Sequence, residues 1–258
     1  MDSDGPSWWV NNSNSGGDCK VKISCATLTY ARTGMLEEAI ESFLRQDYPN
    51  KEMVIYNTYE RQHLTCNSPG VRVINAYSRP ATLGETRNKC IERCEGEFIL
   101  NLDDDDIILP GYLSWLASRL EGRDWIRQDR RFCLRNGRIT GMAEQATNQS
   151  LFRKSAWAAV GGFPHENSGE DKGFRRLLSN RFGGARVECR TEDAGFLYRW
   201  HSSNISRTGP DRPGQLNGMQ NVKRLVMKAM PKRGKVTLHP RWQEDYWQLT
   251  RDYLKAHP

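Results

Sequence analysis

The first half of the chain alternates between short apolar runs and segments with apolar residues at helical spacing. Runs rich in β-branched residues predict buried strands at 21–28, 52–57, 71–76 and 97–102. The segments between them predict helices at 35–47 and 85–94, and Gly96 follows the second helix as a stop signal. Strands that alternate with helices are typical of an α/β fold with a mostly parallel central sheet flanked by helices.

The second half has a less regular pattern. We predict a helix over 111–121, short strands within 125–139, a short helix over 155–163 and a strand over 195–201. Another helix is expected from Gly169 to about Asn180, with Ser168 as its N-cap and with Phe174, Leu177 and Leu178 on its inner face. An aromatic helix is expected near 240–256.

These patterns divide the chain into three parts. Residues 1–20 are rich in Ser, Asn and Gly and predict a flexible arm, 21–205 form the α/β domain, and 206–258 form a basic extension with aromatic residues. No stretch approaches the ~18 uninterrupted apolar residues of a membrane span, and the first residues lack the pattern of a secretory signal. We expect a cytoplasmic protein and leave open a peripheral position at the membrane.

Positive charge is concentrated toward the C-terminus. From Lys172 onward there are 18 Lys and Arg residues against 7 Asp and Glu, whereas residues 1–171 hold 20 against 24. Aromatic residues are interleaved with these cations, among them Trp200, Trp242 and Trp247. Basic regions attract phosphates, and basic surfaces with stacking aromatics suit nucleic acid. The sequence therefore predicts a polyanionic partner, either DNA or an anionic membrane surface.

The cysteines indicate a reducing compartment. Seven are scattered along the chain without a framework, and an odd number is not typical of a disulfide scaffold. Cys90 and Cys94 lie one helical turn apart, but neither a second pair nor a nearby His completes a zinc site. We therefore expect free thiols.

Four consecutive aspartates, Asp103 to Asp106, follow the last of the predicted strands in the first half. Adjacent like charges repel one another, so a partner that neutralises them would explain the arrangement. In an extended backbone alternate residues share a face, which places Asp103 and Asp105 together as ligands for a hard divalent cation. An EF-hand is excluded, because its loop needs Gly and Glu where this chain has Ile108 and Ser114. A solvated acidic turn remains the structural alternative.

Four stretches, in order, resemble the motifs of family 2 glycosyltransferases with the GT-A fold. LDDDDIILP resembles the metal-binding LDxDD…P signature of that family, which contains the DxD motif. ISCATLTYAR resembles the opening strand and its loop, and LGETRN resembles the segment that precedes the DxD strand. VGGFPHENSGED resembles the segment with the catalytic carboxylate. Together they cover roughly residues 21–205. The chain departs from the family at Ala31, where Asn is usual, at Asn57, near which an acidic run is common, and at the additional Asp104.

The resemblance implies a GT-A-like nucleotide-binding domain with a nucleotide-sugar half at 21–110 and an acceptor half at 111–205. It implies a Mn²⁺ or Mg²⁺ ion held by Asp103, Asp105 and His201, with Asp105 as the main ligand. It assigns donor contacts to a wider set of side chains, namely Thr29, Tyr30, Arg32, Asn57, Arg87, Asp103 and Asp104. A surface role for Arg32 and Arg87, and a structural role for His201, stay open.

The same resemblance assigns catalysis to Asp171, with Glu170 beside it. Asp171 would be the general base that takes the acceptor proton as the acceptor oxygen attacks the anomeric carbon, so that the transfer inverts its configuration. Both residues also lie in the first turn of a predicted helix, where an acidic side chain stabilises the helix dipole without any part in catalysis.

For the donor we expect a UDP-sugar, and for the acceptor a hydroxyl of a cell-envelope saccharide or lipid-linked glycan. Glycosylation of a hydroxylated base in DNA, as in phage DNA modification, remains an alternative, as does a non-catalytic module that binds nucleotides or nucleic acid. A nucleotidyltransferase is less consistent with the sequence, since no Gly-rich loop with a basic residue follows the first strand.

Overall fold

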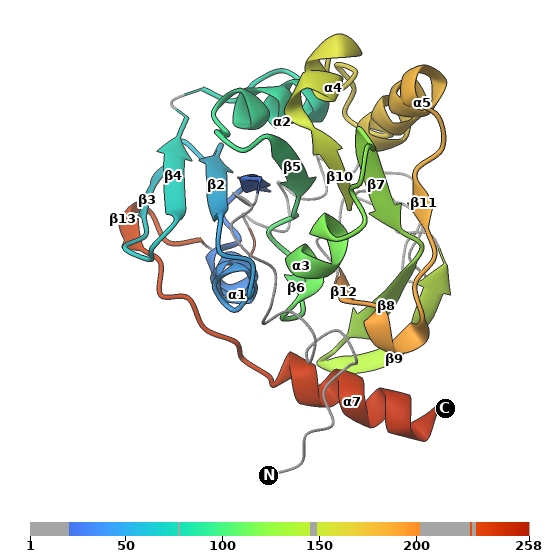
Figure 1. Cartoon of the computed structure of the whole chain (residues 1–258). Coiled ribbons are helices and arrows are strands. Elements are labelled where there is room, and N and C mark those ends of the chain that lie inside the picture. The colour runs from blue at the N-terminus through green and yellow to red at the C-terminus, as the bar shows by residue number, and fades with distance from the viewer. Residues whose placement is uncertain (1–20, 77, 145–148, 202–227, 229–230, 258) are drawn as a thin grey trace.

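The computed structural model describes residues 21–76, 78–144, 149–201, 228 and 231–257 (Figure 1). The flexible arm expected at 1–20 and most of the segment 202–230 lie outside the described residues. Within the described part, no helix is both long enough and apolar enough to cross a bilayer.

A seven-stranded sheet forms the centre of the protein (Figure 1). Its strands, in spatial order, are β11 (Arg186–Val187), β7 (Trp125–Gln128), β10 (Ser150–Arg153), β5 (Phe98–Asn101), β1 (Ile23–Thr29), β2 (Lys51–Asn57) and β4 (Val71–Asn75). β1 pairs in parallel with β2 and β5, and β2 with β4, whereas β10 runs antiparallel to both of its neighbours. The expected α/β fold with a mostly parallel central sheet is confirmed.

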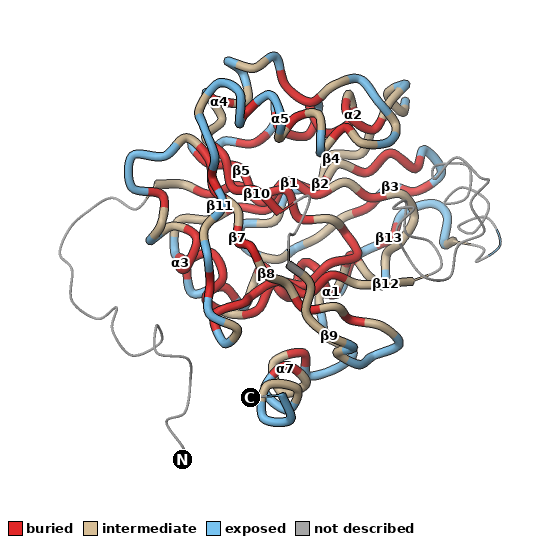
Figure 2. Tube along the Cα trace, turned by 90° about the vertical axis from the view of Figure 1, so that its right-hand side faces the viewer, coloured by how far each residue is buried: buried red, intermediate tan, exposed pale blue. Residues whose placement is uncertain are grey.

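Helices cover both faces of this sheet, because strands buried on two sides need an apolar layer on each. One face carries α2 (Leu83–Glu92), α4 (Lys154–Ala159) and α5 (Glu170–Phe182), and the other carries α1 (Thr33–Leu44) and α3 (Tyr112–Ala117). Figure 2 shows the central strands buried between these two layers. Neighbouring strand residues alternate accordingly, since Val54 packs in the core beneath α2 and α5 and Ile55 in the core beneath α1.

A smaller sheet lies beside the carboxyl end of β5 (Figure 1). Its strands, in spatial order, are β6 (Ile107–Ile108), β12 (Phe196–Trp200), β8 (Arg130–Arg135) and β9 (Arg138–Glu144). Because β5 belongs to the central sheet and β6 to the smaller one, the four aspartates connect the two sheets. β12 runs antiparallel to β6 with Leu197 opposite Ile107, so the chain after Leu197 runs back past the aspartates.

The C-terminal segment returns to the α/β domain. β13 (Gly234–Thr237) pairs in parallel with β3 (Gln62–Thr65), and α7 (Tyr246–Ala256) packs against β9 (Figure 1). Leu238 and Tyr246 are each only 3% exposed. The described part of the extension predicted at 206–258 is therefore in close contact with the domain.

Several local features differ from the sequence predictions. Gly169, with a left-handed φ of 85°, precedes the first turn of α5, so Ser168 is not its N-cap. Phe174 and Leu178 are buried as predicted, but Leu177 is 36% exposed. The short strands β3, β6, β10, β11 and β13 were not predicted, because brief apolar runs have little periodicity and their partners are distant in sequence.

Candidate active site

The four aspartates do not form the extended run that the sequence suggested. The chain turns after β5, and the backbone N–H of Asp106 donates to the carbonyl of Asp103 at 3.2 Å. Asp104 and Asp106 are fully buried, Asp105 is 7% exposed, and only Asp103 is partly open to solvent. The argument from alternating faces was therefore wrong, although it named two of the residues that come together.

Three of the carboxylates converge. Asp103, Asp105 and Asp106 each offer one oxygen, and these oxygens lie within 4.8 Å of one another. Oδ1 of Asp106 accepts the backbone N–H of Arg199 at 3.0 Å, while its buried Oδ2 has no hydrogen bond. Burial beside Asp105 and Asp103 raises the pKa of Asp106. An unsatisfied buried oxygen within a group of carboxylates fits a hard divalent cation such as Mn²⁺ or Mg²⁺.

Arg32 neutralises the other side of this run. Its guanidinium forms a two-pronged ion pair with Asp104, in which the Nε–Oδ2 distance is 3.2 Å, and it contacts Oδ2 of Asp105 at 2.6 Å. Burial raises the pKa of Asp104, and Arg32 opposes that rise. Burial also disfavours ionised Asp105, but Arg32 and His201 outweigh it and hold the pKa of Asp105 below its usual range. Asp104 thus pairs with Arg32 and stands outside the converging group.

His201 lies at the edge of the same cluster. Its Nε2 is 3.0 Å from Oδ2 of Asp105, because β12 carries the chain back past the aspartates. His201 does not belong to the three residues whose ligand atoms converge. Its predicted role as a metal ligand therefore stays a prediction, with Asp105 as its observed partner. Asp106 is instead the third residue of the converging group. The only sequence signal for Asp106 was that it belongs to the run of four aspartates.

Arg87 connects the carboxylate cluster to α5. Its Nη1 is 3.1 Å from Oδ1 of Asp103, and its Nε is 3.2 Å from Oε1 of Glu170, with the Arg87 side chain only 6% exposed. Burial works against the charged guanidinium, but Asp103 and Glu170 together raise the pKa of Arg87. The buried Arg87 guanidinium thereby joins the aspartate run to the GED segment, although the two are distant in sequence.

Close packing fixes the loop that leads into α5. A Cβ atom at Gly84 of α2 would lie 1.8 Å from the carbonyl oxygen of Pro164, so only glycine fits there. The Asn88 side chain donates to the carbonyl of Phe163 at 2.9 Å and accepts the Phe163 backbone N–H at 2.8 Å. Trp157 also donates to Asn88, at 2.9 Å. The LGETRN and GGFP stretches therefore form one rigid support for the start of α5.

The two predicted catalytic carboxylates have different surroundings. Glu170 is 4% exposed and paired with Arg87, and burial raises its pKa against the effect of that arginine. Asp171 is half-buried, and among the described residues no hydrogen bond reaches its carboxylate. Asp171 is therefore the accessible acid of the pair, while Glu170 anchors the helix start to Arg87.

The predicted donor contacts at the end of β1 surround a strained backbone. Thr29 is 3% exposed, and Tyr30 packs edge-on against Tyr59 with ring centroids 5.2 Å apart. Ala31 has a left-handed φ of 61°, a conformation that Asn tolerates better than Ala. The left-handed backbone at this position explains why Asn is usual there in the family. The turn at Ala31 directs Arg32 toward Asp104 and Asp105.

Asn57 has a structural task. Its amide nitrogen donates to the carbonyl of Gln62 at 2.8 Å and to Oδ1 of Asn75 at 2.9 Å, and its oxygen accepts the Tyr59 N–H at 3.1 Å. The side chain is thereby committed to holding β2, β3 and β4 together. We do not carry it into the proposed donor site.

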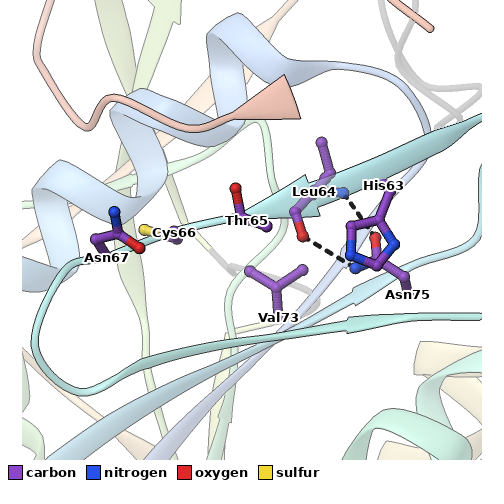
Figure 3. A pocket seen from close by; sticks show the side chains of 7 residues that line it. All are labelled: His63, Leu64, Thr65, Cys66, Asn67, Val73 and Asn75. Atoms are coloured by element: carbon purple, nitrogen blue, oxygen red, sulfur yellow. Dashed lines mark hydrogen bonds between the residues drawn. The ribbon is translucent and has the colours of Figure 1, made fainter. Parts of the chain in front are cut away.

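A shallow pocket of about 460 Å³ lies elsewhere, on β3 and β4 (Figure 3). It is lined by His63, Leu64, Thr65, Cys66, Asn67, Val73 and Asn75. The amide of Asn75 already bonds both backbone groups of Leu64 (Figure 3). None of the predicted site residues lines this pocket, so it is separate from the carboxylate cluster.

Sequence comparisons match the same region. The model of "Glycosyl transferase family 2" matches residues 24–182. The chain is 28% identical over 113 residues to the glycosyltransferase YwdF of Bacillus subtilis, covering 42% of each chain. It is 27% identical over 105 residues to the GalNAc(5)-diNAcBac-PP-undecaprenol beta-1,3-glucosyltransferase of Campylobacter jejuni, covering 38% of this chain and 34% of the relative. The matches thus span well under half of the length of the curated relatives.

Solved structures share the fold over most of the chain. The S. aureus protein TarS, residues 1–349 in complex with UDP-GlcNAc, has a TM-score of 0.57 at 18% identity over 92% of this chain and 72% of that one. The mannosyltransferase PcManGT of Pyrobaculum calidifontis, in complex with GDP-Man and Mn²⁺, has a TM-score of 0.52 at 13% identity over 83% and 66%. These likenesses confirm the expected GT-A fold, and with the family match over residues 24–182 they show that this chain belongs to glycosyl transferase family 2.

Proposed function

We propose that this chain transfers a sugar from a nucleotide-sugar donor to an acceptor hydroxyl, with inversion at the anomeric carbon and with the help of a divalent cation. The observation that carries the proposal is the buried Arg87 bridge from Asp103 to Glu170. It links a candidate cation site to the helix turn that presents Asp171. Fixing both groups on one rigid frame reduces the entropy cost of bringing donor and acceptor together.

On the donor side, Asp103, Asp105 and Asp106 would hold Mn²⁺ or Mg²⁺. The bound cation would act as a Lewis acid that neutralises the charge developing on the departing diphosphate. Arg32 keeps Asp105 ionised, since it holds the pKa of that carboxyl low. Tyr30, at the end of β1, offers a half-buried aromatic ring for the donor base.

On the acceptor side, Asp171 is the proposed general base. Its carboxylate accepts the proton of the acceptor hydroxyl as that oxygen attacks the anomeric carbon on the face opposite the leaving diphosphate. Glu170 positions this turn through Arg87 and does not itself reach the acceptor. Asp171 is half-buried, so its carboxylate is partly accessible to an acceptor hydroxyl.

We further propose a UDP-sugar as donor and a cell-envelope glycan, saccharide or lipid-linked, as acceptor. The similar fold of a protein solved with UDP-GlcNAc supports the donor. The Campylobacter jejuni relative, whose name describes a glucosyltransferase acting on an undecaprenol-linked glycan, supports the acceptor class. The aromatic residues that the sequence offered for nucleic acid, Trp200, Trp242 and Trp247, pack against the hydrophobic core, which weakens the case for a DNA acceptor. The connected carboxylates argue against a non-catalytic binding module.

Donor turnover tests the proposal. Release of UDP from UDP-GlcNAc and other UDP-sugars is measured with Mn²⁺ for the wild type and for Asp171→Asn, with a mixture of envelope glycans as acceptor. We expect Asp171→Asn to lower kcat by roughly 10²–10⁴, the usual contribution of a general base, and to leave UDP affinity unchanged. The control is Glu166→Gln, an exposed carboxylate on the same loop, which should keep full activity.

Equal activity of Asp171→Asn and the wild type would overturn the assignment of the base. Binding of UDP without any turnover of any donor, in the wild type as well, would support the non-catalytic module instead.

A further inference from the structure

The end of β12 has a hydrogen-bonded strand on one side only. Its pairing with β8 continues to the last residue of the strand, whereas its pairing with β6 ends at Leu197. Beyond Leu197 the other edge of β12 faces the aspartates. The backbone N–H of Arg199 donates there to Oδ1 of Asp106 at 3.0 Å, and Nε2 of His201 lies 3.0 Å from Oδ2 of Asp105. Two contacts to the aspartates therefore depend on how this strand end is held.

The side chain of Arg199 is held by groups from two other elements. Its Nη1 is 2.6 Å from Oε2 of Glu38 in α1, and its Nη2 donates to the Tyr246 hydroxyl in α7 at 3.2 Å. The Tyr246 hydroxyl in turn donates to Oε1 of Glu38. Tyr246 is 3% exposed and Glu38 is 2% exposed, so these bonds are shielded from water and stronger than at the surface.

The chain before α7 makes two further contacts with α1. The backbone N–H of His239 donates to Oε1 of Glu37 at 2.9 Å, and that of Gln243 donates to Oε1 of Glu38 at 3.2 Å. Glu38 is thereby the point at which α1, β12 and the C-terminal segment meet. At the other end of α1, Arg32 directly precedes the helix and pairs with the same aspartate run.

We propose that the C-terminal segment, residues 238–256, positions the cation site of the transferase. Tyr246 and Glu38 fix the Arg199 side chain, and the strand end that carries Arg199 holds its N–H against Asp106. Tyr246 is therefore a positioning residue, which acts on the site through Arg199. The proposal rests on the function given above, because it needs the aspartates to hold a cation. Arg199 and Tyr246 both lie outside the residues that match the family model, so the family match alone does not predict this dependence.

Electron paramagnetic resonance of Mn²⁺ in the presence of UDP tests this role. The variant is Tyr246→Phe, which removes the hydroxyl from the network and keeps the ring. We expect it to bind Mn²⁺ about tenfold more weakly than the wild type, since outer groups that orient metal ligands have effects of this size. The resonance of the bound ion should change as well, because Asp106 is held differently. Wild-type affinity in Tyr246→Phe would overturn the proposal.

The control is Tyr253→Leu on the same helix. The Tyr253 ring packs against Phe132 with ring centroids 6.0 Å apart, so its loss loosens α7 without removing a bond of the Glu38 network. Thermal unfolding of both variants measures how far each one loosens the protein. We expect Tyr253→Leu to keep the wild-type affinity for Mn²⁺. Equal weakening of Mn²⁺ binding in the two variants would overturn the proposal, because general packing of α7 would then explain it.

A double-mutant cycle with Asp106→Ala tests the route from Tyr246 to the cation. Without the Asp106 carboxylate, the Arg199 N–H has no ligand to position. We therefore expect Tyr246→Phe to weaken Mn²⁺ binding by less than about twofold in that background. A second loss as large as the one in the wild-type background would overturn the route through Asp106.

The same proteins separate this inference from the proposed function. A wild type that binds Mn²⁺ and UDP, with no change in Tyr246→Phe, would contradict the inference alone. Mn²⁺ binding that depends on Tyr246, without sugar transfer from any donor, would contradict the glycosyltransferase proposal alone. No Mn²⁺ binding by the wild type with UDP present would contradict both.

Discussion

At the residue scale, the site depends on a few side chains whose partners are distant in sequence. Arg87 and Glu170 are 83 positions apart, and Arg32 and Asp105 are 73 apart, yet each pair is in direct contact. Removing one member of such a buried pair leaves the other charge without compensation, which costs far more than the pair itself gains. These arginines are therefore as necessary to the cluster as the carboxylates.

Ala31 offers a test of backbone strain beside the site. Its left-handed φ of 61° costs a residue with a Cβ roughly 1–2 kcal/mol, and Asn tolerates this region better. We predict that Ala31→Asn raises the free energy of unfolding by about 1 kcal/mol, measured by urea denaturation.

The control for Ala31 is Ala158→Asn, at an exposed position in α4, where Asn is a poorer helix former than Ala. That change should lower the stability by about 0.5 kcal/mol. The same sign of change at both positions would contradict the role of the left-handed turn.

The sequence singled out several of the residues that come together at the site, but not their geometry. Asp103, Asp105 and Asp171 stood out because carboxylates in recognisable motifs imply a metal and a base. Asp106 was missed as a partner of Asp103, because the argument assumed an extended backbone where the chain turns. Asn57 was assigned to the donor because of its place in the family pattern. Its bonds to Gln62 and Asn75 depend on how three strands come together and leave no local signal.

At the element scale, the support of α5 by α2 is the feature that places Asp171, the proposed general base. Gly84 allows the loop before α5 to touch the α2 backbone, with its N–H donating to the carbonyl of Glu166 at 3.1 Å. We predict that Gly84→Ala destabilises the protein by about 3 kcal/mol, because a Cβ there would collide with the backbone of Pro164. Thermal unfolding monitored by circular dichroism measures the loss.

Gly34→Ala is the matched control, since no atom lies within 4 Å of a Cβ added at that position of α1. It should gain about 0.5–1 kcal/mol from the better helix propensity of alanine. A Gly84→Ala protein as stable as the wild type would mean that the loop yields easily and that α2 does not hold α5 in place.

A buried network joins α7 to α1 and β12. The Tyr246 hydroxyl donates to Glu38, and Arg199 contacts Glu38 at 2.6 Å and the Tyr246 hydroxyl at 3.2 Å. We predict that Tyr246→Phe lowers the free energy of unfolding by about 2 kcal/mol, as expected for a lost hydrogen bond to a buried charge. Chemical denaturation measures it.

Tyr253→Phe on the same helix provides the comparison, because among the described residues its hydroxyl makes no hydrogen bond while its ring packs against Phe132. It should change stability by less than about 0.5 kcal/mol. Equal losses in the two variants would show that α7 is held by general packing and not by the Glu38 network.

The elements themselves were predicted unevenly. The longer strands and helices of the first half were found, because long apolar runs and helical spacing repeat there, whereas the short strands β3 and β6 of that half were missed. β10 and β13 were missed, since each is four residues long and is stabilised by strands far away in the chain. The start of α5 was assigned to a Ser168 cap, whereas Gly169 in a left-handed conformation makes that turn.

At the scale of the whole molecule, negative and positive charge gather at different places. The aspartates lie where the central sheet meets the smaller one, and Arg127 lies opposite Arg186 in the pairing of β7 with β11. The sequence located the positive charge in the C-terminal third as a whole, but only the fold brings Arg127, from outside that third, beside Arg186.

Manganese binding tests the central claim, that the aspartates after β5 hold a divalent cation for the donor. Electron paramagnetic resonance of Mn²⁺ is followed as protein and UDP are added, for the wild type, Asp105→Asn, Asp106→Asn and the exposed control Asp252→Asn. We predict tight Mn²⁺ binding in the wild type and the control, strengthened by UDP, and at least about tenfold weaker binding in the two cluster variants. Equal Mn²⁺ affinity in all four proteins, or none in the wild type with UDP present, would contradict the account.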